Sequence, residues 1–206
     1  KGGCGKTTIT MQLAGSIGKK ESVLVVDADQ QGTATRWASS ANEEKPFPAT
    51  LTGLSATGAK LHQEVKKYIN KFEYIFIDCP PSTENPISHS ALLISDLAII
   101  PIIPSPADLW ASIGIQQLVK QVMAINETLK VRLLLNMCQP NLRLNKQTFS
   151  EITDFEFDCF KNYLCLRTAY KQSAITGGTV LDLKDAKQAA KELLKLAKEV
   201  LSVFTV

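Results

Sequence analysis

The sequence lacks the features that would place it in a membrane, secreted or metal-binding class. No apolar run reaches the ~20 residues of a membrane-spanning helix, and the first residues lack the pattern of a secretory signal peptide. The five cysteines are odd in number and form no C-x-x-C pair, so neither a zinc site nor a disulfide framework is indicated. We therefore expect a reduced, cytoplasmic protein that uses no membrane.

A strong net charge is also missing. The chain has 23 basic and 20 acidic residues, a net charge of +3, which does not by itself indicate nucleic-acid binding. Any basic surface must therefore be local. The 206 residues, 45% apolar and 21% charged, are ordinary for one globular α/β domain, which we expect to span residues 1–206.

What the sequence does have is a glycine-rich stretch at its start, Lys1-Gly-Gly-Cys-Gly-Lys-Thr-Thr8, followed at once by a helical apolar pattern. Glycines let the backbone curl so that several N–H groups point at a phosphate, and the helix adds its positive N-terminus. Lys6 supplies a charge near the β- and γ-phosphates, and the Thr7 hydroxyl can hold Mg²⁺. The alternative is an ordinary Gly/Lys turn. The predicted nucleotide-binding residues are Gly2, Gly3, Cys4, Gly5, Lys6, Thr7 and Thr8.

Two later apolar runs, residues 22–27 and 74–78, each end in an acid. Continuous apolar runs are typical of strands buried on both faces of a parallel sheet, and ligands bind beyond the ends of such strands. Asp78, at the end of the second run, is where a nucleotide hydrolase holds Mg²⁺. The turn that follows the first run, residues 27–32, could instead be a solvated acidic turn.

These segments together resemble the ParA/MinD family of dimerising ATPases. The string K-G-G-x-G-K-T-T is similar to the family's deviant Walker A loop. The segment D-A-D-Q-Q-G at 27–32 resembles its D-x-D-P-Q-G, with Gln30 in place of proline, and D-C-P-P at 78–81 matches D-x-P-P. Residues 101–109 resemble a segment of the small plasmid-partition branch, although a capped strand-to-helix turn explains them equally well.

The resemblance implies a role for individual residues. Lys1 would reach across a dimer interface to the partner's nucleotide, and Asp29 would position the attacking water. Lys6 would join these two as a catalytic residue. The expected cofactors are ATP and Mg²⁺, with the metal held by Thr7, Asp27 and Asp78. Asn136 would read the adenine edge, with a polar turn residue as the alternative, and Arg167 lies in a segment similar to the family's I-P-R, where Leu166 replaces proline.

Alternation of helical and apolar segments along the chain, read with this resemblance, predicts a mostly parallel twisted sheet with helices on both faces. We expect strands at 22–27, near 47–51 and at 74–78, 95–103, 131–136 and 164–168. We expect helices at 5–19, 33–40, 59–71, 86–94, about 105–126, 145–158 and about 184–203. Because a phosphate loop needs a strand leading into it, we also expect about ten residues, a strand and its turn, upstream of Lys1.

The function that follows is an ATP-dependent dimerising switch for plasmid or chromosome partition. It would bind nonspecific DNA in its ATP-bound homodimer, associate with the nucleoid and be stimulated by a small centromere-binding partner protein. The expected DNA contacts lie on the last helix, with Arg143, Lys146, Lys161 and Lys171 in reserve; each single lysine could equally be a solvated residue. The DNA-contact candidates on that helix are Lys187, Lys191, Lys195 and Lys198.

Three alternatives share the loop. A MinD-like ATPase at a membrane would need a C-terminal amphipathic helix with exposed apolar bulk. A metabolic ATP-dependent ligase of similar fold would need a substrate pocket. An iron–sulfur ATPase would need paired cysteines at its interface, and the cysteines here lack that spacing.

Overall fold

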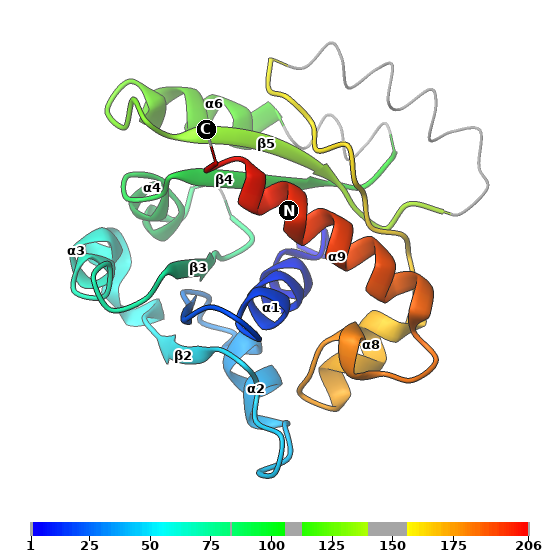
Figure 1. Ribbon diagram of the computed structural model, residues 1–206. Coiled ribbons are helices and arrows are strands. Elements are labelled where there is room, and N and C mark those ends of the chain that lie inside the picture. The colour runs from blue at the N-terminus through cyan, green and yellow to red at the C-terminus, as the bar shows by residue number, and fades with distance from the viewer. Residues whose placement is uncertain (1, 83, 106–112, 140–155, 206) are drawn as a thin grey trace.

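Short apolar strands, all paired in parallel, form the centre of the molecule (Figure 1). The computed structural model describes residues 2–82, 84–105, 113–139 and 156–205. Within them the strands run in two groups, ordered β2-β1-β3 and β4-β5. The predicted α/β fold with a parallel sheet is confirmed. The strands are β1 (Val23–Asp27), β2 (Thr50–Gly53), β3 (Tyr74–Asp78), β4 (Leu97–Ile102) and β5 (Lys130–Leu135).

Helices cover both faces of these strands (Figure 1). One face packs on α1, α2, α8 and α9, and the other on α3, α4 and α6. None of the described helices is long and apolar enough to cross a membrane. The helices are α1 (Lys6–Ile17), α2 (Thr33–Ser39), η1 (Ser55–Lys60), α3 (Leu61–Lys66), α4 (Pro86–Leu92), α6 (Ile113–Met123), α8 (Thr168–Ile175), η2 (Val180–Asp182) and α9 (Lys187–Ser202).

The register of β1 with β3 positions the chemistry. Asp27 and Asp78 are Cα partners at the ends of the two strands. Every residue of β1 is buried, because strands lie on both sides of it and helices lie above and below. Asp27 therefore stands at the end of a fully buried strand, and Asp78, which is also buried, lies beside it.

The structure corrects several element boundaries. The second strand begins at Thr50, three residues later than its expected start, and the helix expected at 59–71 is a 3-10 segment followed by α3, which ends at Lys66. Gly58, with φ of 54°, interrupts that 3-10 segment. The strand expected at 164–168 is a single bridge of Cys165 to Cys138. Most of the helix expected at 145–158 lies outside the described residues.

Polar contacts fix α1 to the C-terminal part of the chain. Gln12 is fully buried; its amide donates to Ser173 Oγ at 2.9 Å and its carbonyl accepts from Val180 N at 2.9 Å. Beyond the end of α1, Lys19 Nζ lies 3.0 Å from the carboxylate of Asp182. The helix that follows the glycine loop is thus held at its middle and near its far end.

Asp182 is the centre of a small charged cluster. Lys45 also contacts it at 2.8 Å, and Thr179 donates to it from its amide and its hydroxyl. Burial alone would raise the pKa of this carboxyl, but Lys45, Thr179 and Lys19 outweigh burial and hold the pKa below its usual range. A carboxyl with a lowered pKa stabilises the fold above the pKa of its unfolded form, and that stabilisation is lost as the pH falls.

We predict that Asp182→Asn lowers the free energy of unfolding at pH 7 by about 1–2 kcal/mol, because the buried Thr179 donors lose a charged acceptor. The difference from the parent chain should shrink as the pH falls below about 4, the unfolded pKa of aspartate. Urea unfolding across this pH range measures it. As a control, Glu64→Gln removes an exposed pair with Lys67 and should cost at most about 0.5 kcal/mol. A pH-independent Asp182 effect would contradict the electrostatic account.

Candidate nucleotide-binding site

The glycine loop has a conformation that only glycine adopts without strain. Gly3 and Gly5 have φ of 83° and 88°, in the left-handed region, and α1 begins at Lys6 immediately afterwards. Gly5 is further restricted, because a Cβ there would lie 2.3 Å from the side-chain nitrogen of Asn136. Beside Gly2 and Gly3, in contrast, there is open space. The loop is therefore packed tightly on one side and open on the other, as a phosphate cradle requires.

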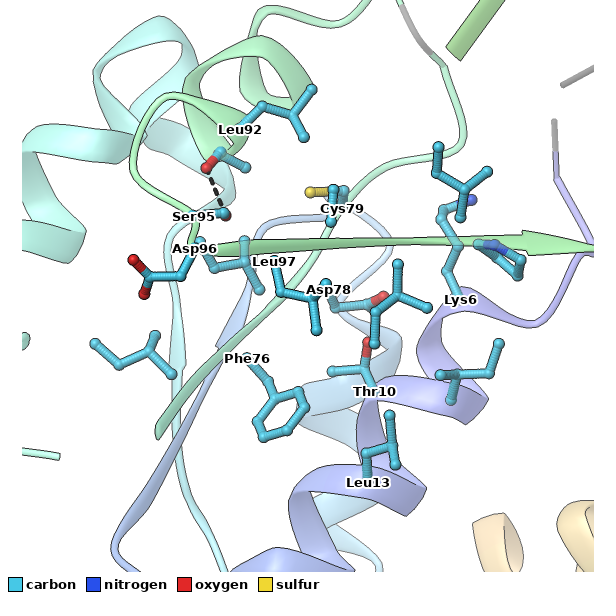
Figure 2. Close-up of a pocket in the computed structure, with 18 of the residues that line it drawn as sticks. Lys6, Thr10, Leu13, Phe76, Asp78, Cys79, Leu92, Ser95, Asp96 and Leu97 are labelled. Atoms are coloured by element: carbon cyan, nitrogen blue, oxygen red, sulfur yellow. Dashed lines mark hydrogen bonds between the residues drawn. The ribbon is translucent and has the colours of Figure 1, made fainter. Parts of the chain in front are cut away.

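The first turn of α1 contacts the end of β3. Thr7 Oγ1 donates a hydrogen bond of 2.7 Å to Asp78 Oδ2. The sequence separation of these two residues is 71, and both were predicted metal ligands. Figure 2 shows Lys6 and Asp78 on neighbouring elements at this end of the strands. The structure therefore brings the loop and the predicted metal-binding acid together.

One carboxylate oxygen of Asp27, the acid at the end of β1, accepts hydrogen bonds from α2. Its Oδ2 accepts hydrogen bonds from Thr35 N and Thr35 Oγ1, each 2.8 Å long, so α2 is anchored on it. Thr35 was not predicted from the sequence, because nothing in the motif marks a hydroxyl one turn into the following helix.

One oxygen of each acid is left over. Within the described part of the chain, Asp27 Oδ1 and Asp78 Oδ1 are buried and have no hydrogen-bond partner. Buried polar atoms are nearly always paired, and hard divalent cations take carboxylate and hydroxyl oxygens as ligands. Two adjacent strand ends that present unpartnered carboxylate oxygens, with Thr7 beside them, therefore fit Mg²⁺ by the chemistry of the donor set.

Burial raises the pKa of Asp78 to about 6. The hydrogen bond from Thr7 opposes this rise, the neighbouring Asp27 adds to it, and Lys6 and Asp29 contribute opposite, smaller effects. Three carboxylates and one ammonium thus act on one another at this edge. A cation bound here would relieve the repulsion among the carboxylates, and strongly shifted pKa values of this kind are typical of functional sites.

Asp29 lies in the turn between β1 and α2 and is half-buried. Its Oδ1 accepts from Gln31 N at 3.0 Å and its carbonyl accepts from Gly32 N at 3.0 Å. These bonds hold the carboxylate at the strand edge although the family's proline is missing. Its predicted role toward water stays a prediction.

Two predicted nucleotide contacts have protein partners. Asn136 follows β5, is buried, and donates from its side-chain amide to Cys4 O at 2.8 Å. Arg167 forms a bidentate pair with Glu192 of α9, with its shortest distance 2.6 Å. Asn136 therefore supports the loop from beneath, and Arg167 ties its own segment to α9. Their expected contacts with the nucleotide are untested by this geometry.

The remaining predicted residues fall into two groups. Lys1 lies outside the described residues, so its cross-dimer role remains a prediction. The four lysines of the last helix are all exposed on α9, as a DNA-binding face requires. Leu194, predicted to belong to the buried stripe of this helix, is instead 53% exposed. The exposed lysines are Lys187, Lys191, Lys195 and Lys198.

Comparisons with known proteins find relatives that match most of this chain. Maintenance of carboxysome distribution protein A from Halothiobacillus neapolitanus is 28% identical over 98% of this chain and 93% of its own length. The chromosome partitioning protein ParA from Myxococcus xanthus is 27% identical over 75% of this chain and 68% of its own. The structure of an aspartate-to-alanine variant of McdA from Cyanothece in complex with ATP has a TM-score of 0.80 at 18% identity, covering 97% of this chain and 93% of that one.

A family model described as the CobQ/CobB/MinD/ParA nucleotide binding domain matches residues 1–180. The matched region contains the glycine loop, the three clustered aspartates and Asn136, and it ends before α9. The solved structure, at its low sequence identity, shows that the fold is shared. The chain therefore belongs to the CobQ/CobB/MinD/ParA nucleotide-binding family.

Proposed function

We propose that the protein is an Mg²⁺-dependent ATPase that dimerises with ATP and acts as a switch in DNA partition. The observation that carries the ATPase is the 2.7 Å contact of Thr7 with Asp78, beside two unpartnered carboxylate oxygens and beneath a left-handed glycine loop. ATP hydrolysis is also the activity of the ParA/MinD type of protein to which the family assignment points.

Each residue then has a physical task. The loop amides and the N-terminus of α1 bind phosphate, and Lys6 adds a positive charge to them. Thr7, Asp27 and Asp78 would hold Mg²⁺, which neutralises charge that develops on the phosphates. Asp29, fixed in its turn, would orient water for attack. Asn136 keeps the loop in shape through Cys4.

We predict that Asp29→Ala still binds ATP but hydrolyses it at least about 100-fold more slowly, since a positioned acid–base group contributes that much or more. Asp29→Asn keeps the acceptor for Gln31 N–H and should show the same defect, which separates loss of charge from a loosened turn. Gln30→Ala, exposed in the same turn, is the matched control. Single-turnover hydrolysis decides: a rate for Asp29→Asn equal to that of the parent chain would rule out this role.

We predict that Lys1→Ala binds ATP as a monomer, whereas the parent chain dimerises. The reason is that Lys6 already supplies the loop with its own lysine, so a second lysine at the front is available to a partner subunit. Light scattering with ATP measures the mass, and Lys20→Ala, at an exposed position beyond α1, is the control. Normal dimerisation and hydrolysis by Lys1→Ala would show that Lys1 does not reach across the dimer interface to the partner's nucleotide.

The exposed face of α9 supports DNA binding. Its four lysines span Lys187 to Lys198, about 16 Å along the helix axis. The acids of this helix, Glu192 and Glu199, both contact other parts of the protein. Glu192 pairs with Arg167, and Glu199 accepts hydrogen bonds from the backbone N–H groups of residues 161 and 162. The solvent face of α9 is therefore basic although the whole chain carries only +3. Two such faces in a dimer would double the phosphate contacts.

We predict that replacing the four α9 lysines with Gln weakens DNA binding in the ATP state while ATPase activity persists. Each lost phosphate contact should flatten the dependence of log K on log salt by about 0.9. The matched control removes the same charge from the α3 region, on the opposite side of the sheet (Figure 1), through Gln at Lys60, Lys66, Lys67 and Lys71. Equal losses in both variants, or equal DNA affinity in ADP and ATP, would contradict the proposed face.

A MinD-like action at a membrane is the less favoured alternative, because Leu193, Leu196 and Val200 of α9 are buried in the core, which leaves Leu194 as the large apolar residue of this helix that is exposed. A different cargo is a stronger second candidate, since a relative named for carboxysome distribution matches nearly the whole chain. Deleting the gene separates the two: partition predicts plasmid or chromosome loss, whereas a protein-body cargo predicts clustering of that body without DNA loss. Co-sedimentation with liposomes and with DNA, each with ATP, tests the membrane alternative.

A further inference from the structure

The two buried acids of the candidate site share one pattern of contacts. Thr7 donates to Asp78 Oδ2, and Thr35 donates to Asp27 Oδ2. In the part of the chain that the structure describes, Oδ1 of each acid is buried without a hydrogen-bond partner. Each carboxylate therefore has one oxygen held by a threonine and one oxygen available to a ligand. Thr7 belongs to the glycine loop, whereas Thr35 lies outside every predicted functional motif.

Thr35 contacts Asp27 through two donors. Its backbone N–H and its hydroxyl both donate to the same carboxylate oxygen, each at 2.8 Å. The torsion that turns a carboxylate about its bond to Cβ is broad and roughly two-fold, so an unrestrained group presents either oxygen. Two hydrogen bonds to Oδ2 restrict this rotation, and the unpartnered Oδ1 then keeps one direction.

The two bonds have different causes. Thr35 is the third residue of α2, and the backbone N–H groups at the start of a helix have no partner within the helix. Asp27 accepts from one of these N–H groups, and that bond would form with any residue except proline at position 35. The second bond needs a hydroxyl on Cβ, as in Thr or Ser. Capping of α2 therefore explains the first bond but not the second.

Helix formation and core packing do not require a threonine at this position. Thr35 is exposed, although the carboxylate that it contacts is buried. Alanine also favours a helix more than threonine does. The hydroxyl in the first turn of α2 is thus better explained by what it does to Asp27 than by the packing of the helix.

A fixed direction of Oδ1 matters for a metal ion. Asp27 and Asp78 are Cα partners at the ends of adjacent strands, so their unpartnered oxygens lie at the same edge of the sheet. Mg²⁺ demands near-ideal octahedral geometry, so a ligand that can turn away binds it less well. Hydrogen-bond partners of metal-binding carboxylates orient them in this way.

We propose that Thr35 is a positioning residue for Mg²⁺: its hydroxyl holds the Asp27 carboxylate so that Oδ1 is presented to the metal. This inference rests on the Mg²⁺-dependent ATPase proposed above and adds a residue to it. Asp29 lies in the turn between these two residues, and bonds from Gln31 N and Gly32 N hold it there independently. Thr35 therefore acts through Asp27 rather than through Asp29.

Binding of Mn²⁺, followed by electron paramagnetic resonance, tests the proposal. Mn²⁺ takes the same kinds of oxygen ligand as Mg²⁺, and ADP in place of ATP keeps hydrolysis out of the measurement. Thr35→Ala removes the hydroxyl, and Thr35→Ser keeps it. Thr33→Ala, exposed in the first turn of the same helix, is the matched control.

We expect Thr35→Ala to raise the dissociation constant for Mn²⁺ by about 10-fold, with Thr35→Ser and Thr33→Ala within about twofold of the parent chain. ADP affinity in EDTA should be the same in all forms, because the loop binds phosphate without the metal. Saturating Mg²⁺ should restore single-turnover hydrolysis of ATP by Thr35→Ala, since Asp29 keeps its own bonds.

A double-mutant cycle separates this role from a general weakening of α2. If Thr35 acts through the carboxylate, Thr35→Ala should weaken Mn²⁺ binding no further in an Asp27→Asn chain.

Equal Mn²⁺ affinity of Thr35→Ala and the parent chain, or an equal loss in Thr35→Ser, would overturn the proposal and leave the ATPase proposal intact. A further loss in the Asp27→Asn chain, or hydrolysis that stays slow at saturating Mg²⁺, would do the same. A parent chain that binds no Mn²⁺ with ADP would overturn both proposals.

Discussion

The register between β1 and β3 is the constraint on which the rest of the site depends. It sets Asp27 directly beside Asp78, so two buried carboxylates must share one edge of the sheet. Their hydrogen bonds recruit the helices that follow: Thr7 brings the first turn of α1 to β3, and Thr35 brings α2 to β1. Lys6 directly precedes Thr7, so the contact of Thr7 with Asp78 also places Lys6 at this edge of the sheet.

Local sequence signals were sufficient for the loop, the acids and the strands that carry them. Glycine is needed where φ is positive, and Gly3 and Gly5 have such values. Continuous apolar runs ending in an acid predicted β1 and β3, and the Tyr74–Asp78 boundaries agree with the expected ones. These signals are strong because each depends on a few consecutive residues and one physical requirement.

Contacts between distant segments could not be predicted in this way. The partners of Gln12 lie more than 160 residues away, and Asn136 meets Cys4 across 132 residues. Both side chains are polar, so their pattern in the sequence indicates surface rather than burial. Leu194 shows the converse error: it was assigned to the buried stripe because it is apolar, but at 100° per residue it lies on the side of α9 that carries the exposed lysines. The predicted helix boundaries near Gly58 were wrong because the helical propensity of the sequence there is weak.

The unpartnered oxygens of Asp27 and Asp78 also mean that the site lowers the stability of the folded chain. A carboxyl whose pKa is raised to about 6 binds its proton more tightly in the folded chain than in the unfolded one. The ionised Asp78 carboxylate therefore destabilises the folded chain. This destabilisation is absent below about pH 4, grows as the pH rises, and reaches its full size above about pH 6. At neutral pH the free protein bears this cost in full, and a bound cation would relieve it. A cation bound to Asp78 would therefore raise the free energy of unfolding most at neutral pH and least below about pH 4.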